Sequence, residues 1–237
     1  MPLSHSLVAL LVTALWGLSF VVIKLGVGTT PPLLLAALRF LFAALPAVFF
    51  VPRPKTDWRS VVGYGFFLGV AQFGLLFAAL AVGMPASLAS VVTQAQVFFT
   101  ILFAALLMGE RPGPHQVIGG FVAGLGLVLI AWPRMTSGGA VPFLMTVLAA
   151  AAWGVANIIS KRAGRVDMLG FIVWSSLVAP LPLFGLSLWL DGPAQVFTAL
   201  TQLNGGTMAA VAYLAYPTTV FAFGVWAYSC PGTRRPP

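Results

Sequence analysis

The chain consists of long apolar segments separated by short breaks that contain proline, glycine or charged residues. A helix needs roughly 20 residues to cross the ~30 Å hydrocarbon core of a bilayer, and each segment is close to that length. The segments are continuously apolar, whereas the strands of a membrane barrel alternate over about ten residues. We therefore predict eight transmembrane helices, at Ser6–Gly26, Leu33–Val51, Val61–Val82, Ala86–Met108, Gln116–Trp132, Ala140–Ser160, Met168–Leu190 and Thr207–Ser229.

The composition excludes a soluble globular protein. Hydrophobic residues make up 60% of the chain and charged residues 7%, whereas a soluble domain carries about 25% charged residues. Only Lys24 and Arg39 lie inside the predicted spans. The single cysteine, Cys230, excludes a disulfide framework. The predicted fold class is an all-α polytopic membrane protein.

The basic residues predict the orientation of the chain in the membrane. The net charge is +8, but the cations sit in short loops beside apolar spans, so we interpret them as topology determinants and expect no nucleic-acid partner. With the N-terminus inside, nine fall in inner loops (Arg53, Lys55, Arg59, Arg111, Lys161, Arg162, Arg165, Arg234 and Arg235) and only Arg134 falls outside. We predict a multi-pass protein of the inner (plasma) membrane with both termini cytoplasmic.

An internal repeat points to a transport function. Trp16-Gly17 followed by Lys24 in the first span recurs as Trp153-Gly154 followed by Lys161 in the sixth. A unit of five helices is odd, so its second copy would enter the membrane from the opposite side, as in transporters with alternating access. We predict a first five-helix repeat over 1–133, an incomplete second repeat with three helices over 140–229, and an aberrant tail over 230–237.

Five stretches resemble the EamA-type transporters of the drug/metabolite transporter superfamily, namely Ala14–Lys24, Pro31–Phe40, Gly83–Ser90, Gln94–Thr100 and Gly109–Arg111. The resemblance runs from about Val8 to Tyr228 and is greatest to the members that export cysteine and O-acetylserine. It implies a ten-helix protein built from two inverted five-helix repeats, so this chain is expected to be C-terminally truncated by two helices. On that expectation the chain inserts into the membrane but transports negligibly unless another subunit completes it.

Seven residues are candidates for the substrate pathway: Trp16, Lys24, Arg39, Gln94, Gln96, Trp153 and Asn157. Charges within a span face the bundle interior or snorkel to its edge, and both alternatives stay open for Lys24 and Arg39. If Arg39 lines a cavity, its guanidinium can hold a carboxylate with two hydrogen bonds. The tryptophans and amides line a cavity or join neighbouring helices.

Other polar and small residues predict structure rather than transport. All four acidic residues lie in loops or at span ends, so no mid-membrane carboxylate is available as a proton relay. Glu110 is predicted to pair with its neighbour Arg111. The pairs Gly65/Gly69 and Gly120/Gly124 predict close helix packing. Motifs for a metal site, a nucleophile elbow or a phosphate-binding loop are absent from the sequence, so we expect no enzyme, cofactor or metal.

The leading hypothesis is a secondary transporter that exports small polar metabolites, amino acids or derivatives such as cysteine and O-acetylserine. The candidate charges are basic, which favours a substrate with a carboxylate. The alternatives are a multidrug exporter of the same superfamily and a non-transporting truncated fragment. Expected partners are a small-molecule substrate, the lipid bilayer, and a second copy or a completing subunit.

Overall fold

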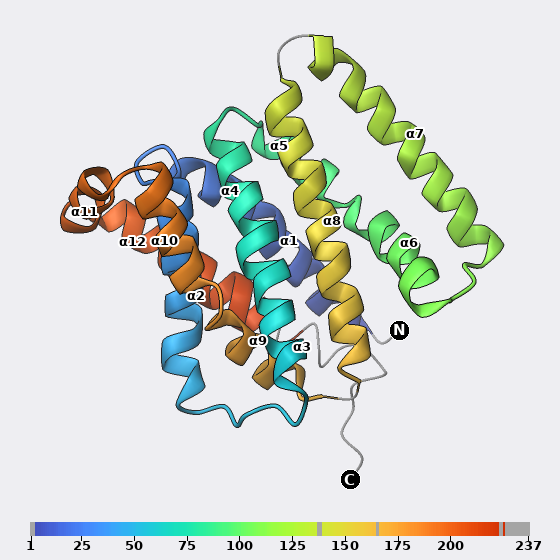
Figure 1. Cartoon of the computed structure of the whole chain (residues 1–237), viewed down its shortest axis with the longest axis horizontal. Helices are drawn as coiled ribbons and strands as arrows, with labels where there is room; N and C mark the ends of the chain where they lie inside the picture. Colours follow the sequence, from blue (N-terminus) through green and yellow to red (C-terminus); the bar gives the residue numbers. More distant parts are fainter. Residues whose placement is uncertain (1–2, 137–138, 165, 223–224, 226–237) are drawn as a thin grey trace.

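The computed structural model describes residues 3–136, 139–164, 166–222 and 225 of the 237-residue chain, and these residues are all helical or in loops. The aberrant tail predicted for 230–237 lies outside them. Figure 1 shows the bundle. In chain order its elements are α1 (Leu3–Gly26), α2 (Pro32–Val48), α3 (Trp58–Tyr64), η1 (Gly65–Gln72), α4 (Phe73–Ala81), α5 (Ala86–Thr93), α6 (Gln96–Met108), α7 (Pro114–Thr136), α8 (Ala140–Arg162), α9 (Met168–Ser176), α10 (Pro180–Leu190), α11 (Pro193–Thr201), α12 (Gly205–Ala215) and η2 (Tyr216–Phe221).

Six helical segments of the described chain are long and apolar enough to cross a membrane: Leu7–Gly26, Trp58–Ala81, Ala86–Met108, Pro114–Pro133, Ala140–Arg162 and Met168–Leu190. They match six of the eight predicted spans and confirm a polytopic all-helical protein. The second predicted span is the shorter apolar helix α2. The eighth overlaps α12 and η2 and continues beyond residue 222, so the count of eight stays a prediction.

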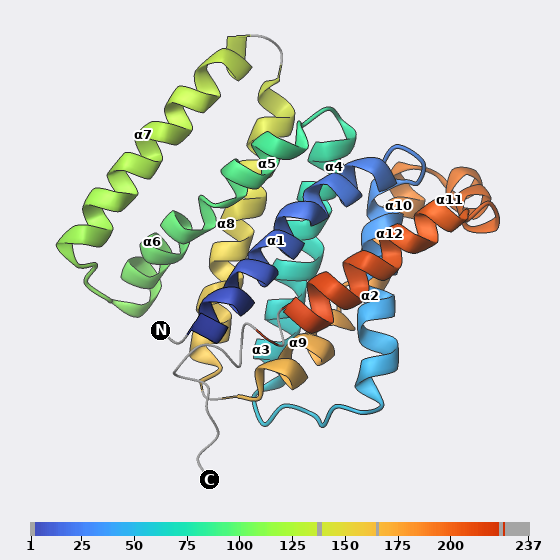
Figure 2. The same ribbon diagram turned by 180° about the vertical axis from the view of Figure 1, so that it is seen from behind.

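Helix α2 forms the centre of one half of the bundle. It packs against α4, α9, α10 and α12 (Figure 1), so every residue from Leu33 to Phe40 is buried. A helix that is buried on all sides has apolar residues around its whole circumference and is not amphipathic. Helix α8 is the centre of the other half and packs against α3, η1, α4, α5 and α6. Figure 2 shows α1 and α12 side by side across the face opposite α9 and α10, where they contact each other.

Several predicted spans contain breaks that the sequence explains to different degrees. The seventh divides into α9 and α10 immediately before Pro180, because proline lacks the N–H that continues a helix. The fourth divides into α5 and α6 at Gln94-Ala95, where no proline or glycine marks the break. The short helix α11, between the seventh and eighth predicted spans, was not predicted either.

The two glycine pairs behave differently. A methyl group at Gly65 would overlap the Ser175 backbone oxygen, and one at Gly69 would lie 2.5 Å from Ala179 Cβ, so η1 packs closely on the α9–α10 junction as predicted. The prediction for Gly120/Gly124 holds only at Gly120, where a methyl group would lie 3.4 Å from Phe98 Cδ2 of α6. Helix α7 stands at the edge of the bundle (Figures 1 and 2), and a methyl group at Gly124 would have no described atom within 4 Å.

Candidate functional site

A small cavity lies at the middle of the bundle, where α1, α2, η1, α4, α5 and α8 meet. We call it the central cavity, and it is lined by Trp16, Ser19, Phe20, Ile23, Arg39, Gln72, Phe73, Leu76, Thr93 and Trp153. Its volume is about 40 Å³. One water molecule needs about 10–15 Å³ on this scale, so the cavity has room for a few waters but not for an amino acid.

Arg39 is the charged residue of this cavity, and only 2% of it is exposed. Its Nε and Nη2 donate hydrogen bonds to Thr219 Oγ1 at 3.2 and 3.1 Å, and Nη2 also lies 3.5 Å from Thr218 Oγ1. The guanidinium carbon stands 4.0 Å from the centre of the Phe73 ring, which is a close cation–π contact. The described structure therefore holds Arg39 with hydroxyl groups and an aromatic face.

No acidic side chain is placed to neutralise Arg39. Asp57 and Asp167 precede α3 and α9, Asp191 follows α10, and Glu110 follows the residue that ends α6. All four therefore lie at helix ends, whereas Arg39 lies in the middle of α2. The charge at the centre of the bundle is uncompensated by a carboxylate.

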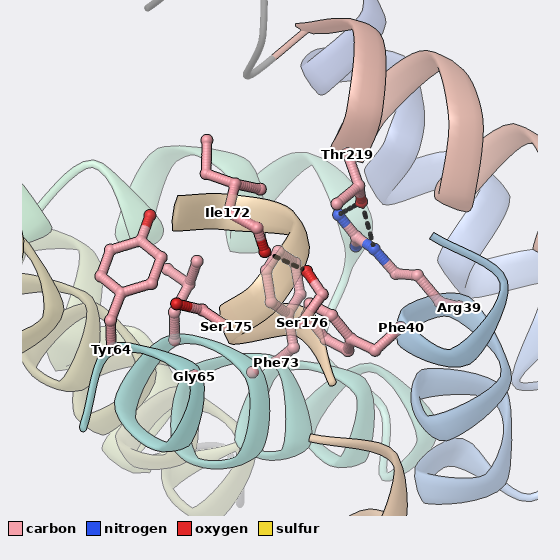
Figure 3. Close-up of a pocket in the computed structure, with 11 residues that line it drawn as sticks. Arg39, Phe40, Tyr64, Gly65, Phe73, Ile172, Ser175, Ser176 and Thr219 are labelled. Carbon is pink, nitrogen blue, oxygen red and sulfur yellow. Dashed lines mark hydrogen bonds between the residues drawn. The ribbon is translucent and has the colours of Figure 1, made fainter. Parts of the chain in front are cut away.

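A second, smaller cavity of about 10 Å³ lies on the other side of Arg39 and Phe73. Figure 3 shows Arg39 and Thr219 at one end of it, Tyr64 at the other, and Ser175 and Ser176 of α9 between them. Ser176 Oγ donates to Ile172 O at 2.8 Å, within its own helix. Arg39 and Phe73 line both cavities and separate them.

Three buried side-chain atoms around these cavities have no hydrogen-bond partner among the described residues: Arg39 Nη1, Gln72 Oε1 and Ser175 Oγ. Leaving a buried polar atom unpaired costs about 1–3 kcal/mol, and more for a charged group. Such atoms are therefore rare in native structures and call for a specific explanation. Arg39 Nη1 and Gln72 Oε1 belong to residues of the same central cavity, one a donor and the other an acceptor.

Two π-helical segments position these groups. In η2, Thr218 Oγ1 and Thr219 Oγ1 both donate to Leu214 O, at 2.7 and 2.8 Å. Pro217 has no N–H to donate to the carbonyl of Tyr213, which favours the wider turn. The wider turn places two consecutive threonines near the same guanidinium. In η1, the last residue is Gln72. Such segments recur at functional sites.

Three of the seven predicted pathway residues, Trp16, Arg39 and Trp153, come together in the central cavity. Trp16 also donates from Nε1 to Thr218 O at 3.2 Å, so it connects α1 to η2. Lys24 is placed elsewhere. Its Nζ donates to Leu80 O at 2.6 Å, at the end of α4, where the last carbonyls have no partner within the helix and favour a cation.

The predicted amides separate into two environments. Asn157 Nδ2 donates to Gln96 Oε1 at 2.8 Å and to Thr100 Oγ1 at 2.9 Å, so these residues join α8 to α6. Gly154 lies one turn earlier in α8 and lets the helices approach, because a methyl group there would stand 2.8 Å from Phe99 Cβ. Gln94 is exposed at the break between α5 and α6 and is absent from the central cavity.

The predicted pair of Glu110 with Arg111 is wrong. Glu110 Oε1 lies 2.6 Å from Lys161 Nζ, and Arg162 Nη2 donates to Leu107 O at 2.6 Å. Gly109 ends α6 with φ +68°, and this left-handed turn carries the following carboxylate toward the end of α8. Adjacency in sequence was therefore a poor guide to ion pairing at this helix end.

Four residues that the structure places around Arg39 were not expected from the sequence: Phe73, Ser175, Thr218 and Thr219. Ser175-Ser176 and Thr218-Thr219 are adjacent hydroxyl pairs inside apolar spans, which is a signal that could have been used. Within the described part of the chain, no three His, Cys, Asp or Glu side chains gather in a way that could hold a metal ion.

Comparisons with known proteins point to one group. The family described as "EamA-like transporter family" matches residues 3–132. The chain is 39% identical over 232 residues to the "Probable amino-acid metabolite efflux pump" of Escherichia coli (strain K12), a match that covers 95% of this chain and 78% of that protein. It is 40% identical over 228 residues to the protein of the same name from Salmonella typhimurium, covering 92% and 75%.

A solved structure, titled only "Crystal structure of protein", has the same fold. It superimposes with a TM-score of 0.61 at 24% sequence identity and covers 94% of this chain and 77% of that one. At this identity the likeness concerns the arrangement of the helices alone.

Proposed function

Because the chain belongs to the EamA-like transporter family, we propose that it is a secondary transporter that exports small amino-acid metabolites through the central cavity. The names of the Escherichia coli and Salmonella relatives, both amino-acid metabolite efflux pumps, support this substrate class. In this proposal Trp16, Arg39 and Trp153 contact the substrate. Gln96 and Asn157 hold the helices beside it, Lys24 caps α4, and Gln94 faces outward until the helices move.

The observation that carries the proposal is the unpaired Nη1 of Arg39. A guanidinium buried without a carboxylate costs free energy that the protein would avoid if the residue only supported the fold. A substrate carboxylate that enters the central cavity supplies the missing acceptor and the missing charge, with the short, strong hydrogen bonds of an arginine–carboxylate pair. The substrate is then bound near the bilayer midplane, as in other secondary transporters.

The aromatic walls of the same cavity support the alternative of a multidrug exporter. Trp16, Phe20 and Trp153 line the cavity with aromatic rings, and such rings attract a lipophilic cation. The uncompensated charge of Arg39 opposes that ligand, since two like charges in a medium of low dielectric repel strongly. We therefore place carboxylated solutes first.

The proposed mechanism is the rocking of two inverted repeats about the central cavity, in an eight-span inner-membrane protein with both termini cytoplasmic. The repeated Trp-Gly motifs of α1 and α8 support it, because both tryptophans line this cavity. The cavity is too small for an amino acid, so this conformation corresponds to a closed intermediate between the two open states.

Export of cysteine by the purified protein in proteoliposomes tests the proposal. Arg39→Gln should reduce transport of cysteine at least tenfold while transport of cysteine methyl ester, which lacks the carboxylate, changes less than twofold. Arg53→Gln is the matched control, because Arg53 is exposed, stacks on Trp58 and does not line the cavity. Equal loss for both solutes would assign Arg39 a structural role and contradict the proposal.

A further inference from the structure

Gln72 combines deep burial in the central cavity with an unused hydrogen-bond acceptor. It is the last residue of η1, 1% of it is exposed, and its Oε1 has no donor among the described residues. In a membrane-embedded bundle a glutamine usually bonds to a neighbouring helix, as Gln96 does with Asn157. The carbonyl oxygen of Gln72 makes no such bond, so helix packing does not explain its place.

The two unpaired groups of the central cavity are complementary to the two ends of a zwitterion. Arg39 Nη1 is a donor without an acceptor, and Gln72 Oε1 is an acceptor without a donor. An α-amino acid carries a carboxylate for the first and an ammonium group for the second. The aromatic rings of Trp16, Phe20 and Trp153 in the same cavity add attraction for the ammonium group.

We infer that Gln72 Oε1 receives the α-ammonium group of the substrate, so that the central cavity selects zwitterionic amino acids over the same acids without the amino group. The inference rests on the proposed role of Arg39 and adds the second half of substrate recognition. A neutral amide is a suitable acceptor here. A carboxylate in its place would pair with Arg39 and would close the cavity to the substrate.

Binding of three thiols to the purified full chain in detergent tests the inference without requiring transport. Cysteine carries both charged groups, 3-mercaptopropionate lacks only the amino group, and cysteamine lacks only the carboxylate. Affinities are obtained from the ligand-dependent rise of the apparent melting temperature. The wild-type protein should bind cysteine at least tenfold more tightly than 3-mercaptopropionate. Gln72→Leu should weaken cysteine binding about tenfold and leave 3-mercaptopropionate binding unchanged.

A conservative variant and a control keep the result interpretable. Gln72→Asn retains a carbonyl acceptor and should keep part of the preference for cysteine. Gln202→Leu changes an exposed glutamine remote from the cavity and should behave as the wild-type protein does. Equal affinity of the wild-type protein for cysteine and 3-mercaptopropionate would overturn the inference and leave the role of Arg39 intact. Absence of binding by both acids would overturn the proposed function as well. Equal weakening of both acids by Gln72→Leu would show a structural role for Gln72.

Discussion

In the proposed site, hydroxyl groups and an aromatic ring hold the charge of Arg39 in one orientation. Its Nε and one terminal nitrogen bond to Thr219 Oγ1, and its flat face covers Phe73. Threonine hydroxyls orient the guanidinium without neutralising it, whereas a carboxylate would do both. The second terminal nitrogen therefore stays buried and unpaired in a fixed direction. Orientation without neutralisation is what a reversible binding site for an anion requires.

The hydroxyl of Thr219 is the group to test at this scale. Thr219→Val removes the acceptor of two Arg39 donors, so the guanidinium becomes less well oriented. Interhelical hydrogen bonds in membrane proteins are worth about 0.6 kcal/mol on average and up to about 1.7. We expect the affinity for cysteine to fall roughly three- to tenfold, measured by the ligand-dependent melting shift.

Two further variants distinguish the effect of the Thr219 hydroxyl from other effects of a substitution. Thr219→Ser keeps the hydroxyl and should bind cysteine as the wild-type protein does. Thr13→Val removes an exposed hydroxyl that bonds only to carbonyls of its own helix, at Ala9 and Leu10, and should have no effect. A serine variant as weak as the valine variant would show that the hydroxyl is not the cause.

The position and contacts of a single residue could be predicted only where its partner could be identified from the sequence. A charge inside an apolar span must face the bundle interior or snorkel to its edge. The sequence left both alternatives open for Arg39, and the structure buries it. Lys24 could be placed near a membrane edge, but its acceptor belongs to a helix about 56 residues later. Gln94 was assigned to a continuous helix, and the break between α5 and α6 then determined where it points. The direction of a side chain could not be predicted from the sequence where a helix breaks without a proline or glycine, as at Gln94.

At the scale of elements, the repeated Trp-Gly motif has one clear structural reason. In α8 the glycine admits the backbone of α6, and the preceding tryptophan lines the central cavity. In α1 the tryptophan lines the same cavity, but a methyl group at Gly17 would have no described atom within 4 Å. The motif and its spacing to the following lysine are visible in the sequence. The sequence could not predict which of the two glycines is in close contact, because that depends on the neighbouring helix.

The close contact of η1 with α9 gives a prediction at the element scale. Gly65→Ala forces a methyl group against the Ser175 backbone and Val178, and overpacking of this kind costs about 1–3 kcal/mol. We expect the apparent melting temperature in detergent to fall by several degrees. Gly124→Ala is the matched control, since its methyl group would meet open space and alanine favours a helix over glycine. A Gly65 variant as stable as the Gly124 variant would contradict this packing.

The ion pair between the ends of α6 and α8 should contribute little to stability. Lys161 and Glu110 are 52% and 43% exposed, and exposed pairs are typically worth about 0.2–1 kcal/mol. We therefore expect Glu110→Gln to lower the melting temperature by no more than about 4 °C. The difference should shrink in 1 M salt, where screening acts within about 3 Å. A large loss that persists in high salt would show that the pair holds the two helices together.

For the whole molecule, the sequence predicted the class of fold well because the bilayer imposes it. In the bilayer core no water is available to bond the backbone, so each N–H and C=O must be paired within the protein, and continuous apolar segments form helices. The described residues contain six such spans. The packing of these helices against one another could not be predicted as well, because apolar residues that face lipid and those that face another helix look alike in the sequence. Helix α7, whose spanning segment contains no buried residue, and helix α2, buried along Leu33–Phe40, illustrate this ambiguity.

The proposed orientation of the whole molecule leads to the last prediction. Positive charges gather in the loops that we place inside the cell, including Lys55, whereas the loop after α11, including Gln202, lacks them. Both residues are exposed. In a Cys230→Ser background without other cysteines, a cysteine at Gln202 should react with a membrane-impermeant maleimide on intact spheroplasts. A cysteine at Lys55 should react only after the membrane is permeabilised. Reversed labelling would invert the topology, and labelling of both sites from outside would mean that a span between them is wrong.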